Sequence, residues 1–431
     1  MLKNKKLYMQ IYDYYKNLIE EGKLQEGAKL PSIRRCAEER NVSKTTVELS
    51  FMCLCDDGYI MPKSQSGYYV SKREIAPKGS TKKEKEKDNK SNIIYDFSSS
   101  GVDSESFNMD IWRRYVKSAL RQTEKLLFYG EPQGEIELRR EIAEYVRQSR
   151  NCVCSEENIV IGAGVQALLN ILCPILKNRK TVYFEDDNYK QGIAVFEDYG
   201  YKICEKSKSN ILYVSPSYQG KTGDTMTVRE RFALVEFAKE NNKLIIEDDY
   251  GSEFRYLNRP TPSLQGLAGG ENVVYLGTFS KLLLPSIRIS FMILPDSFLK
   301  EYNHKSSLYN QTVGKVDQMA LCSYIRDGHL NSQIRKSRKI YVQKSKILGD
   351  LLAQNFGKKV KILKSDSPLY VRCVFDLDLS NAEIEKALLE KGVSVINSNE
   401  KGEIIFSVSS VPVNSLEKAC STIKNALAIC Q

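Results

Sequence analysis

Histidine is almost absent from this sequence: its 431 residues include only two, His304 and His329, and neither lies near a cysteine pair or a carboxylate motif. Zinc sites and histidine-based catalytic triads both depend on placed imidazoles, so neither kind of site is expected. The eleven cysteines also lack paired CxxC spacing. Their alternation within predicted elements, as at Cys53 and Cys55, is typical of reduced, packed thiols. No metal site is predicted.

Long apolar runs are missing too. None approaches the ~20 residues that a membrane helix requires, and polar residues interrupt the apolar N-terminal stretch. We therefore expect no signal peptide, no membrane span and a cytoplasmic location. A length of 431 residues suggests two or three domains. The net charge of +10 favours a polyanionic partner such as nucleic acid, although one lysine-rich segment carries much of it.

The first seventy residues carry the pattern of three helices and a hairpin. Apolar residues recur at helical spacing over residues 7–24, and Pro31-Ser32 and Ser43 then supply start signals for two further helices. Short alternating runs at residues 59–61 and 67–70 flank a polar hairpin tip. This arrangement predicts a winged helix-turn-helix domain over residues 1–72.

The next segment changes character. Residues 73–93 are rich in lysine and glutamate and show no apolar periodicity, so we expect a solvated, flexible tether. The alternative, a single charged helix, is interrupted by Pro77 and Gly79. The chain is thus predicted to divide into a winged helix, a linker and a larger domain at residues 94–431.

From residue 94 onward, β-type runs alternate with helical ones, which predicts a mostly parallel, doubly wound α/β sheet. The last hundred residues read as a small α+β domain. The predicted strands of the sheet are residues 159–161, 181–184, 211–214, 244–246 and 273–276, with helices at 166–176 and 228–241.

Two of these strands end in residues that suggest a coenzyme. Residues 244–246 break into Glu247-Asp248-Asp249-Tyr250, and residues 273–276 lead to Lys281, with Arg288 after it. Pyridoxal phosphate (PLP) requires such a set: an amine for the Schiff base, a carboxylate for the ring nitrogen, a phenol for the ring oxygen and an arginine for the phosphate. Spacing alone leaves Asp248 and Asp249 open as the ring partner. A coenzyme site tethered to a DNA-binding domain suggests a sensor.

The N-terminal motifs resemble the GntR-type winged helix. The segments are Lys29-Leu-Pro-Ser-Ile-Arg-Arg35, Asn41-Val-Ser-Lys-Thr-Thr-Val47 and Asp57-Gly-Tyr-Ile60, followed by Ser66-Gly-Tyr-Tyr-Val70. The resemblance implies three groups of DNA contacts: Ser32 and Arg34, then Lys44, Thr45 and Thr46 at the start of the recognition helix, then Gln65, Ser66 and Gly67 at the wing tip. Short hydroxyls and a cation at a helix N-terminus suit close approach to phosphate. The small net charge of the module implies a dimer on DNA.

The remaining motifs resemble fold-type I aminotransferases as fused to GntR domains, the combination found in the MocR/GabR-type regulators. The segments are Phe128-Tyr-Gly-Glu-Pro-Gln-Gly134, Gly162-Ala-Gly-Val-Gln166, Glu247-Asp-Asp-Tyr-Gly-Ser-Glu-Phe-Arg-Tyr256 and Thr278-Phe-Ser-Lys281. The resemblance implies a full set of PLP contacts: Lys281 as Schiff-base lysine, Asp248 at the ring nitrogen, Tyr250 at the ring oxygen, Tyr189 stacked on the ring, Thr278, Ser280, Arg288 and the amides of Val165 and Gln166 around the phosphate, and Tyr129 reaching the phosphate of the other subunit. This role of Tyr129, together with a linker of about twenty residues, predicts a homodimer exchanged head to tail.

The chain departs from that family at two places. In the loop Pro216–Gly223, Tyr218 stands where the family has histidine and Lys221 where it has proline, which weakens the assignment of Gln219 to the ring oxygen. After Arg372 the sequence contains no arginine. Aminotransferases grip the substrate carboxylate with an arginine of the small domain, because its fork matches a carboxylate. Amino-acid transamination is therefore in doubt.

Three functions compete. The first is a PLP-dependent transcription regulator that binds operator DNA and senses PLP, an amine or an amino acid. The second is a working aminotransferase with an accessory winged helix. The third is a DNA-binding protein whose aminotransferase-like domain only dimerises. The intact set of Lys281, Asp248 and Tyr250 argues against the third, and the missing arginine argues against the second.

Overall fold

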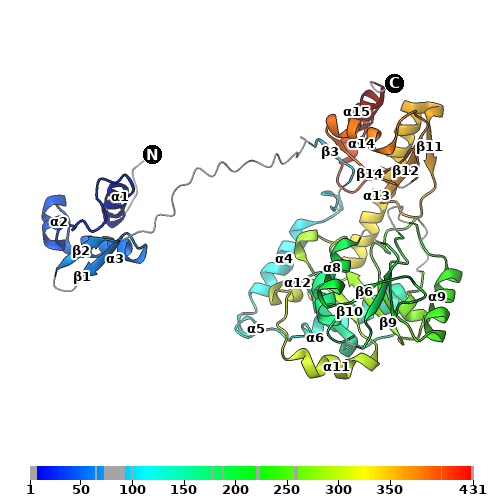
Figure 1. The fold of residues 1–431 in the computed structure, drawn as a ribbon, viewed down its shortest axis with the longest axis horizontal. Helices are drawn as coiled ribbons and strands as arrows, with labels where there is room; N and C mark the ends of the chain where they lie inside the picture. The colour runs from blue at the N-terminus through cyan, green and yellow to red at the C-terminus, as the bar shows by residue number, and fades with distance from the viewer. Residues whose placement is uncertain are drawn as a thin grey trace. The chain divides into compact units, whose positions relative to one another are not determined.

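The protein divides into two compact units, Met1–Asn89 and Lys90–Gln431, and Figure 1 labels many of their elements. The structure, a computed structural model, describes residues 7–63, 66–71, 93–98, 101–176, 178–186, 189–219, 224–256, 261–398 and 400–428. The predicted tether, residues 73–93, lies outside the described residues except for Ile93.

The first unit is a winged helix-turn-helix. Its helices are α1 (Leu7–Glu20), α2 (Ile33–Arg40) and α3 (Lys44–Asp56), and its antiparallel hairpin joins β1 (Ile60–Lys63) to β2 (Gly67–Val70). Ser32 and Ser43 cap α2 and α3, as the sequence predicts: each side chain accepts a hydrogen bond from the backbone N–H three residues on, at 3.2 Å. Buried Tyr15, Val47, Phe51 and Leu54 lie in the core between the helices and the hairpin.

The second unit contains a seven-stranded sheet in the order β4-β10-β9-β8-β7-β5-β6. Only β10 runs antiparallel to its neighbours. The doubly wound, mostly parallel sheet predicted from the sequence is therefore confirmed; β6 and β10 were not predicted. The strands are β4 (Ile159–Gly162), β5 (Thr181–Phe184), β6 (Lys202–Ile203), β7 (Ile211–Val214), β8 (Leu244–Asp248), β9 (Val273–Thr278) and β10 (Ser290–Ile293).

Helices cover both faces of this sheet because the strand residues that point toward either face are apolar. Val160 and Tyr213 lie in a core shared with α7, α8 and α11, whereas Ile161 and Leu212 face the side covered by α6, α9 and α10. The helices are α4 (Met109–Leu120), α5 (Thr123–Leu126), α6 (Ile136–Arg150), α7 (Val165–Leu172), α8 (Lys190–Asp198), α9 (Val228–Glu240), α10 (Leu264–Leu267), α11 (Asp296–Ser306) and α12 (Lys315–Arg326).

A smaller α+β domain follows, also as predicted. Its antiparallel sheet has the order β11-β12-β15-β14 and packs with α14 and α15. The long helix α13 (His329–Phe356) runs from the large domain into the small one (Figure 1). The elements of this domain are β11 (Val360–Leu363), β12 (Tyr370–Phe375), α14 (Asn381–Glu390), β13 (Val393–Ser394), β14 (Ile396–Asn397), β15 (Glu403–Ser407) and α15 (Leu416–Ala428).

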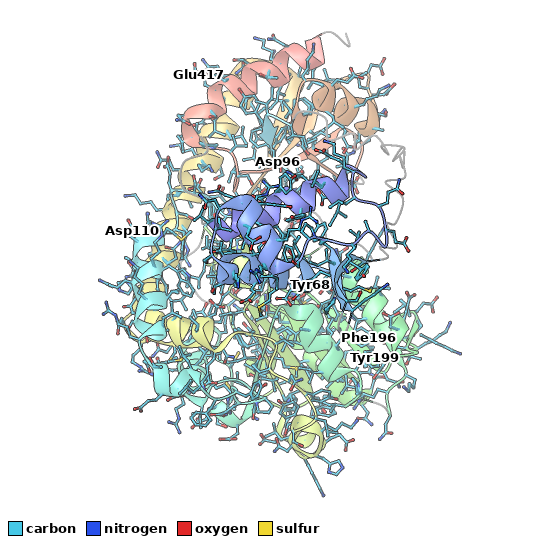
Figure 2. The ribbon with its side chains drawn as sticks, turned by 90° about the vertical axis from the view of Figure 1, so that its left-hand side faces the viewer. Tyr68, Asp96, Asp110, Phe196, Tyr199 and Glu417 are labelled. Atoms are coloured by element: carbon cyan, nitrogen blue, oxygen red, sulfur yellow. The ribbon has the colours of Figure 1, made fainter. Side chains whose placement is uncertain are left out.

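The start of the second unit is tied to this small domain. Strand β3 (Tyr95–Asp96) pairs in parallel with β13, and the ring of Phe97 packs edge-on against Phe406. Helix α4, which follows, and α15 each carry an exposed acidic residue in the first turn, Asp110 and Glu417 (Figure 2). These carboxylates offset the positive end of the helix dipole. None of the helices in the described part of the chain is long and apolar enough to span a bilayer.

Candidate functional site

Most of the predicted coenzyme residues follow the carboxyl ends of adjacent strands. Strands β8 and β9 are parallel neighbours with Asp248 opposite Leu276, so the loops carrying Tyr250 and Lys281 leave the sheet at the same edge. In open α/β sheets this edge is where ligands bind. Among the described residues, no cluster of histidine, cysteine and carboxylate side chains could hold a metal ion there.

The Lys281 amine lies inside the protein. Its residue is only 3% exposed, and its Nζ donates a hydrogen bond to the carbonyl of Gly101 at 2.9 Å. Burial, and then the nearby charge of Lys344, lower the pKa of Lys281 to about 7. At neutral pH a large share of this amine is therefore unprotonated, which is the form that attacks an aldehyde.

The two candidate carboxylates have different surroundings. Asp249 pairs with Arg150 (Nη2 to Oδ1, 2.9 Å) and accepts hydrogen bonds from three hydroxyl groups, those of Ser217, Ser252 and Tyr275. Burial raises the pKa of Asp248 to about 6, against the effect of its hydrogen bond from the Tyr213 hydroxyl (2.7 Å). Asp248 forms no salt bridge with any described residue. A pyridinium nitrogen would supply the missing positive charge, which favours Asp248 over Asp249.

An aromatic platform stands beside Asp248. The ring of Tyr189 stacks on that of Tyr213 at 5.6 Å between centroids, and a side chain at Gly192 would collide with it. Burial and then the charge of Asp248 raise the pKa of Tyr189, whereas Arg288 lowers it. Tyr189 thus lies within electrostatic reach of both residues, and the structure brings these three predicted contacts together.

Arg288 and the start of α7, both predicted to hold the phosphate, meet at a tight turn. Gly164, with φ of 96°, precedes Val165 and Gln166 at the start of α7, and a Cβ atom there would lie 2.3 Å from an Arg288 guanidinium nitrogen. The hydroxyl of Ser280 is buried and has no hydrogen-bond partner among the described residues, while Thr278 Oγ1 accepts from the Ser280 amide. A helix N-terminus, an arginine and an orphaned hydroxyl suit a phosphate group.

These observations fit PLP. The buried amine, the uncompensated carboxylate and the anion-binding turn correspond to the aldehyde, ring nitrogen and phosphate of that coenzyme. Tyr250 is half-buried, and its ring meets that of Tyr218 edge-on at 5.6 Å. Burial raises the pKa of Tyr250, so its hydroxyl stays protonated and able to donate.

Two predicted contacts lie elsewhere. The Gln219 side chain donates to Glu185 at 3.2 Å, and residues 220–223 of the same loop lie outside the described residues. Its assignment to the ring oxygen stays a prediction. Tyr129 is fully exposed, beside exposed Leu127 and Phe128, so within one chain it takes no part in the cluster.

Several residues at this site were missed by reasoning from the sequence. Tyr213 lies in the middle of a predicted strand, where an aromatic residue usually signals core packing alone. Gly101 and Lys344 are distant from Lys281 in the sequence, and no local pattern connects them. The signal that could have found Tyr213 is the pairing of β7 with β8. It places Tyr213 opposite Ile246, two residues before Asp248.

Arg372 is the last arginine of the chain and belongs to β12. Its Nε donates to Glu403 at 2.8 Å, and its Nη1 lies 2.9 Å from both carboxylate oxygens of Asp224. The residue opposite Arg372 on β15 is Ile405. The guanidinium is thus already neutralised by two acidic groups, which suits a structural role for Arg372.

The predicted DNA contacts gather at the starts of α2 and α3. Arg34, Lys44 and Thr45 are exposed, and Arg34 pairs loosely with Glu38 (Nε to Oε1, 3.2 Å). Thr46 is held at the helix start by the Ser43 hydroxyl, 2.7 Å from its own. These side chains project from the two elements that a helix-turn-helix presents to DNA.

The wing offers a second basic surface. Gly67, at φ of 108°, opens β2, and the Ser66 hydroxyl lies 2.6 Å from that of Tyr69. Lys29 and Lys63 lie over the ring of Tyr69, so two cations accompany the predicted wing residues. Gln65 lies outside the described residues.

Each of the two units matches a known protein family. Residues 7–70 match bacterial regulatory proteins of the gntR family, and residues 96–423 match aminotransferase class I and II. The chain is 26% identical over 421 residues to the probable rhizopine catabolism regulatory protein MocR of Rhizobium meliloti, an alignment covering 90% of this chain and 85% of that protein. The chain belongs to the MocR/GabR-type regulators of the GntR family.

Two further regulators are similar to this MocR-type protein along most of its length. It is 38% identical over 408 residues to the HTH-type transcriptional regulator YdeL of Bacillus subtilis, covering 89% of this chain and 86% of the relative. It is 24% identical over 442 residues to the HTH-type pyridoxine biosynthesis transcriptional regulator PdxR of Corynebacterium glutamicum, covering 97% and 96%. This MocR-type protein is a DNA-binding transcription regulator with an aminotransferase-like effector unit.

A solved structure shows the fold of the effector unit. The chain superimposes on LysN, an α-aminoadipate aminotransferase of Thermus thermophilus complexed with a phosphopyridoxyl-leucine, with a TM-score of 0.66 and 21% identity, covering 78% of this chain and 92% of LysN. The predicted fold-type I architecture is confirmed. Membership of the aminotransferase class I and II family implies that the MocR-type regulator binds PLP.

Proposed function

We propose that this regulator holds PLP covalently on Lys281, and that the state of the coenzyme sets how firmly the winged helix binds its operator. The observation that carries the proposal is the buried Lys281 amine with a pKa of about 7, in a unit that also provides Asp248 and the Gly164 turn. Such an amine is ready to react with an aldehyde at neutral pH. Because the winged helix belongs to the same chain, a reaction at Lys281 can change how firmly the protein binds DNA.

The residues of the site have separate tasks in this proposal. Lys281 supplies the neutral amine, and Asp248 keeps a proton on the ring nitrogen. Arg288, Ser280 and the first amides of α7 hold the phosphate, and Tyr250 donates to the ring oxygen. Tyr189 excludes water from one face of the ring. PLP, when bound, supplies an electron-withdrawing ring.

Vitamin B6 itself is our first choice of signal. A ligand needs only to bind one arrangement of domains better than another, by about 1–3 kcal/mol, to act as a regulator. PLP meets this requirement through its phosphate and its bond to Lys281, and a relative along nearly the whole chain is named a pyridoxine biosynthesis regulator. An amine or amino acid that reacts with the coenzyme is the second choice.

The test uses the wild-type protein with and without added PLP. We expect a visible absorption band on addition of PLP, and a change of about 5- to 150-fold in affinity for a duplex carrying the promoter region of its own gene. A protein that stays colourless with excess PLP would contradict the proposal. A coloured protein with unchanged DNA affinity would leave the coenzyme in place but remove its regulatory role.

The regulator should also be a homodimer, exchanged head to tail, in which each winged helix lies over the effector unit of the other chain. A tether of about twenty residues can span tens of ångströms. Leu127, Phe128 and Tyr129 form a row of exposed apolar side chains, 75%, 74% and 103% exposed, that a second chain would cover. Sedimentation or light scattering at micromolar concentration should give twice the chain mass, and a monomer would contradict this arrangement.

Catalytic turnover should be negligible. In transamination, the Cα–H bond that breaks must stand perpendicular to the coenzyme ring. Holding the substrate carboxylate in place can contribute several kcal/mol to that alignment. Arg372, paired with Asp224 and Glu403, is poorly suited to the task. Steady-state assays with a panel of amino donors and keto acids should show no more than trace product. Turnover near one per second, a typical enzyme rate, would favour an active aminotransferase instead.

A further inference from the structure

Two buried lysines, one of them Lys281, donate hydrogen bonds to the same short segment of the chain. We call this segment, residues 101–106, the strap. Lys281 donates to the carbonyl of Gly101 at 2.9 Å, and Lys344 donates to Asp103 Oδ2 at 2.7 Å. Both lysines are buried, at 3% and 0% exposed. Lys344 lies on α13 and has no assigned role in holding the coenzyme.

The strap is shaped around the Asp103 carboxylate. One of its oxygens accepts from the amides of Glu105 and Ser106, at 2.8 and 3.0 Å, and the other accepts from Lys344. The backbone amide of Asp103 donates to the Tyr341 hydroxyl at 3.3 Å, one helical turn before Lys344. Removing one partner of a buried ion pair leaves an uncompensated charge, so this pair fixes the strap firmly on α13. Gly101, two residues away, is fixed with it.

We propose that Lys344 is a positioning residue for coenzyme capture: paired with Asp103, it holds the carbonyl of Gly101 against the Lys281 amine and sets a second positive charge near that amine. The inference rests on the proposed role of Lys281. Capture forms a carbon–nitrogen double bond between Lys281 Nζ and the aldehyde carbon of PLP. The aldehyde oxygen leaves as water with the two amine hydrogens.

The charges around the two lysines decide the direction of the effect. The titratable groups facing them among the described residues are Lys344, Asp103, Glu105 and Tyr341. The Lys344 ammonium disfavours a second ammonium at Lys281, which lowers the pKa of Lys281 in addition to the effect of burial. Without Lys344 this repulsion is lost, and Asp103, two residues from Gly101 on the strap, keeps an unpaired negative charge, which favours the protonated form of Lys281. Capture would then require a higher pH.

The experiment measures coenzyme capture over a pH series, by the visible band and by borohydride reduction followed by mass spectrometry of the Lys281 peptide. The quantity compared is the capture midpoint, the pH at which half of the protein has bound PLP covalently. Lys344→Met should move this midpoint upward by about one pH unit or more. Lys344→Arg, which keeps the charge and the donors, should restore the wild-type midpoint.

Lys336→Met is the matched control. Lys336 also lies on α13 and donates to the strap, at the carbonyl of Glu105 (2.6 Å), but its side chain is exposed. This variant should keep the wild-type midpoint. If Lys336→Met moves it as far as Lys344→Met does, general loosening of the strap explains the effect and the inference is wrong.

The remaining outcomes also separate the possibilities. An unchanged midpoint in folded Lys344→Met overturns the inference alone, provided that the wild type captures PLP. If Lys344→Met does not fold, Lys344→Arg decides: a wild-type midpoint supports the inference, and an upward shift overturns it. A wild type that captures no PLP at any pH overturns the proposed function, and the positioning role with it.

Discussion

Replacing Lys281 with alanine should abolish covalent coenzyme binding, and with it the visible absorption band and the effect of PLP on DNA binding. No other lysine among the described residues combines this burial with a place at the carboxyl edge of the sheet beside Asp248. The phosphate turn remains, so free PLP can still bind weakly and without the band. Absorption spectra and DNA titrations with and without PLP measure both effects.

Lys300→Ala provides the control for this substitution. Lys300 is an exposed residue of α11, and losing its side chain should leave the band and the DNA response as in the wild type. A band that survives in Lys281→Ala would assign the coenzyme to another amine. Loss of the band with an intact DNA response would mean that PLP acts through its phosphate alone, or that the signal enters elsewhere.

The parts of this structure that follow local rules could be predicted from the sequence. Ser32 and Ser43 cap their helices because a short hydroxyl satisfies a backbone N–H that a helix start leaves unpaired. The β-type runs predicted at residues 244–246 and 273–276 give the positions of β8 and β9, and the edge of the sheet where the loops after them meet. Fold class and the central coenzyme residues therefore needed no knowledge of distant contacts.

The parts that depend on distant contacts could not be predicted. Lys344 is one of several lysines spaced along α13, and a carboxylate 241 positions away decides that this one is buried. Strand β10 is only four residues long, and its antiparallel place between β4 and β9 is settled by pairing on both sides. The orientation of Gln219 likewise depends on Glu185, which belongs to another loop. Sequence spacing carries no information about such pairs.

The DNA-binding surface should be separable from the coenzyme site. Arg34→Ala and Lys44→Ala are each expected to weaken binding to the promoter duplex by about 1–3 kcal/mol if the side chains reach base edges. Both residues are exposed, and the pairing of Arg34 with Glu38 across a single helical turn contributes little to stability. The variants should therefore fold as the wild type does and keep the visible band unchanged.

Arg35→Ala is the matched control for the DNA surface. Arg35 follows Arg34 on α2, is equally exposed and pairs with Glu39 in the same way (2.8 Å), but the GntR resemblance assigns it no base contact. A phosphate contact at Arg35 would weaken binding to all duplexes alike, whereas loss of a base contact at Arg34 should weaken the promoter duplex more than an unrelated one. If Arg34→Ala and Lys44→Ala bind the promoter region as tightly as the wild type, the recognition surface lies elsewhere on the winged helix, and the cations beside Tyr69 on the wing become the first alternative.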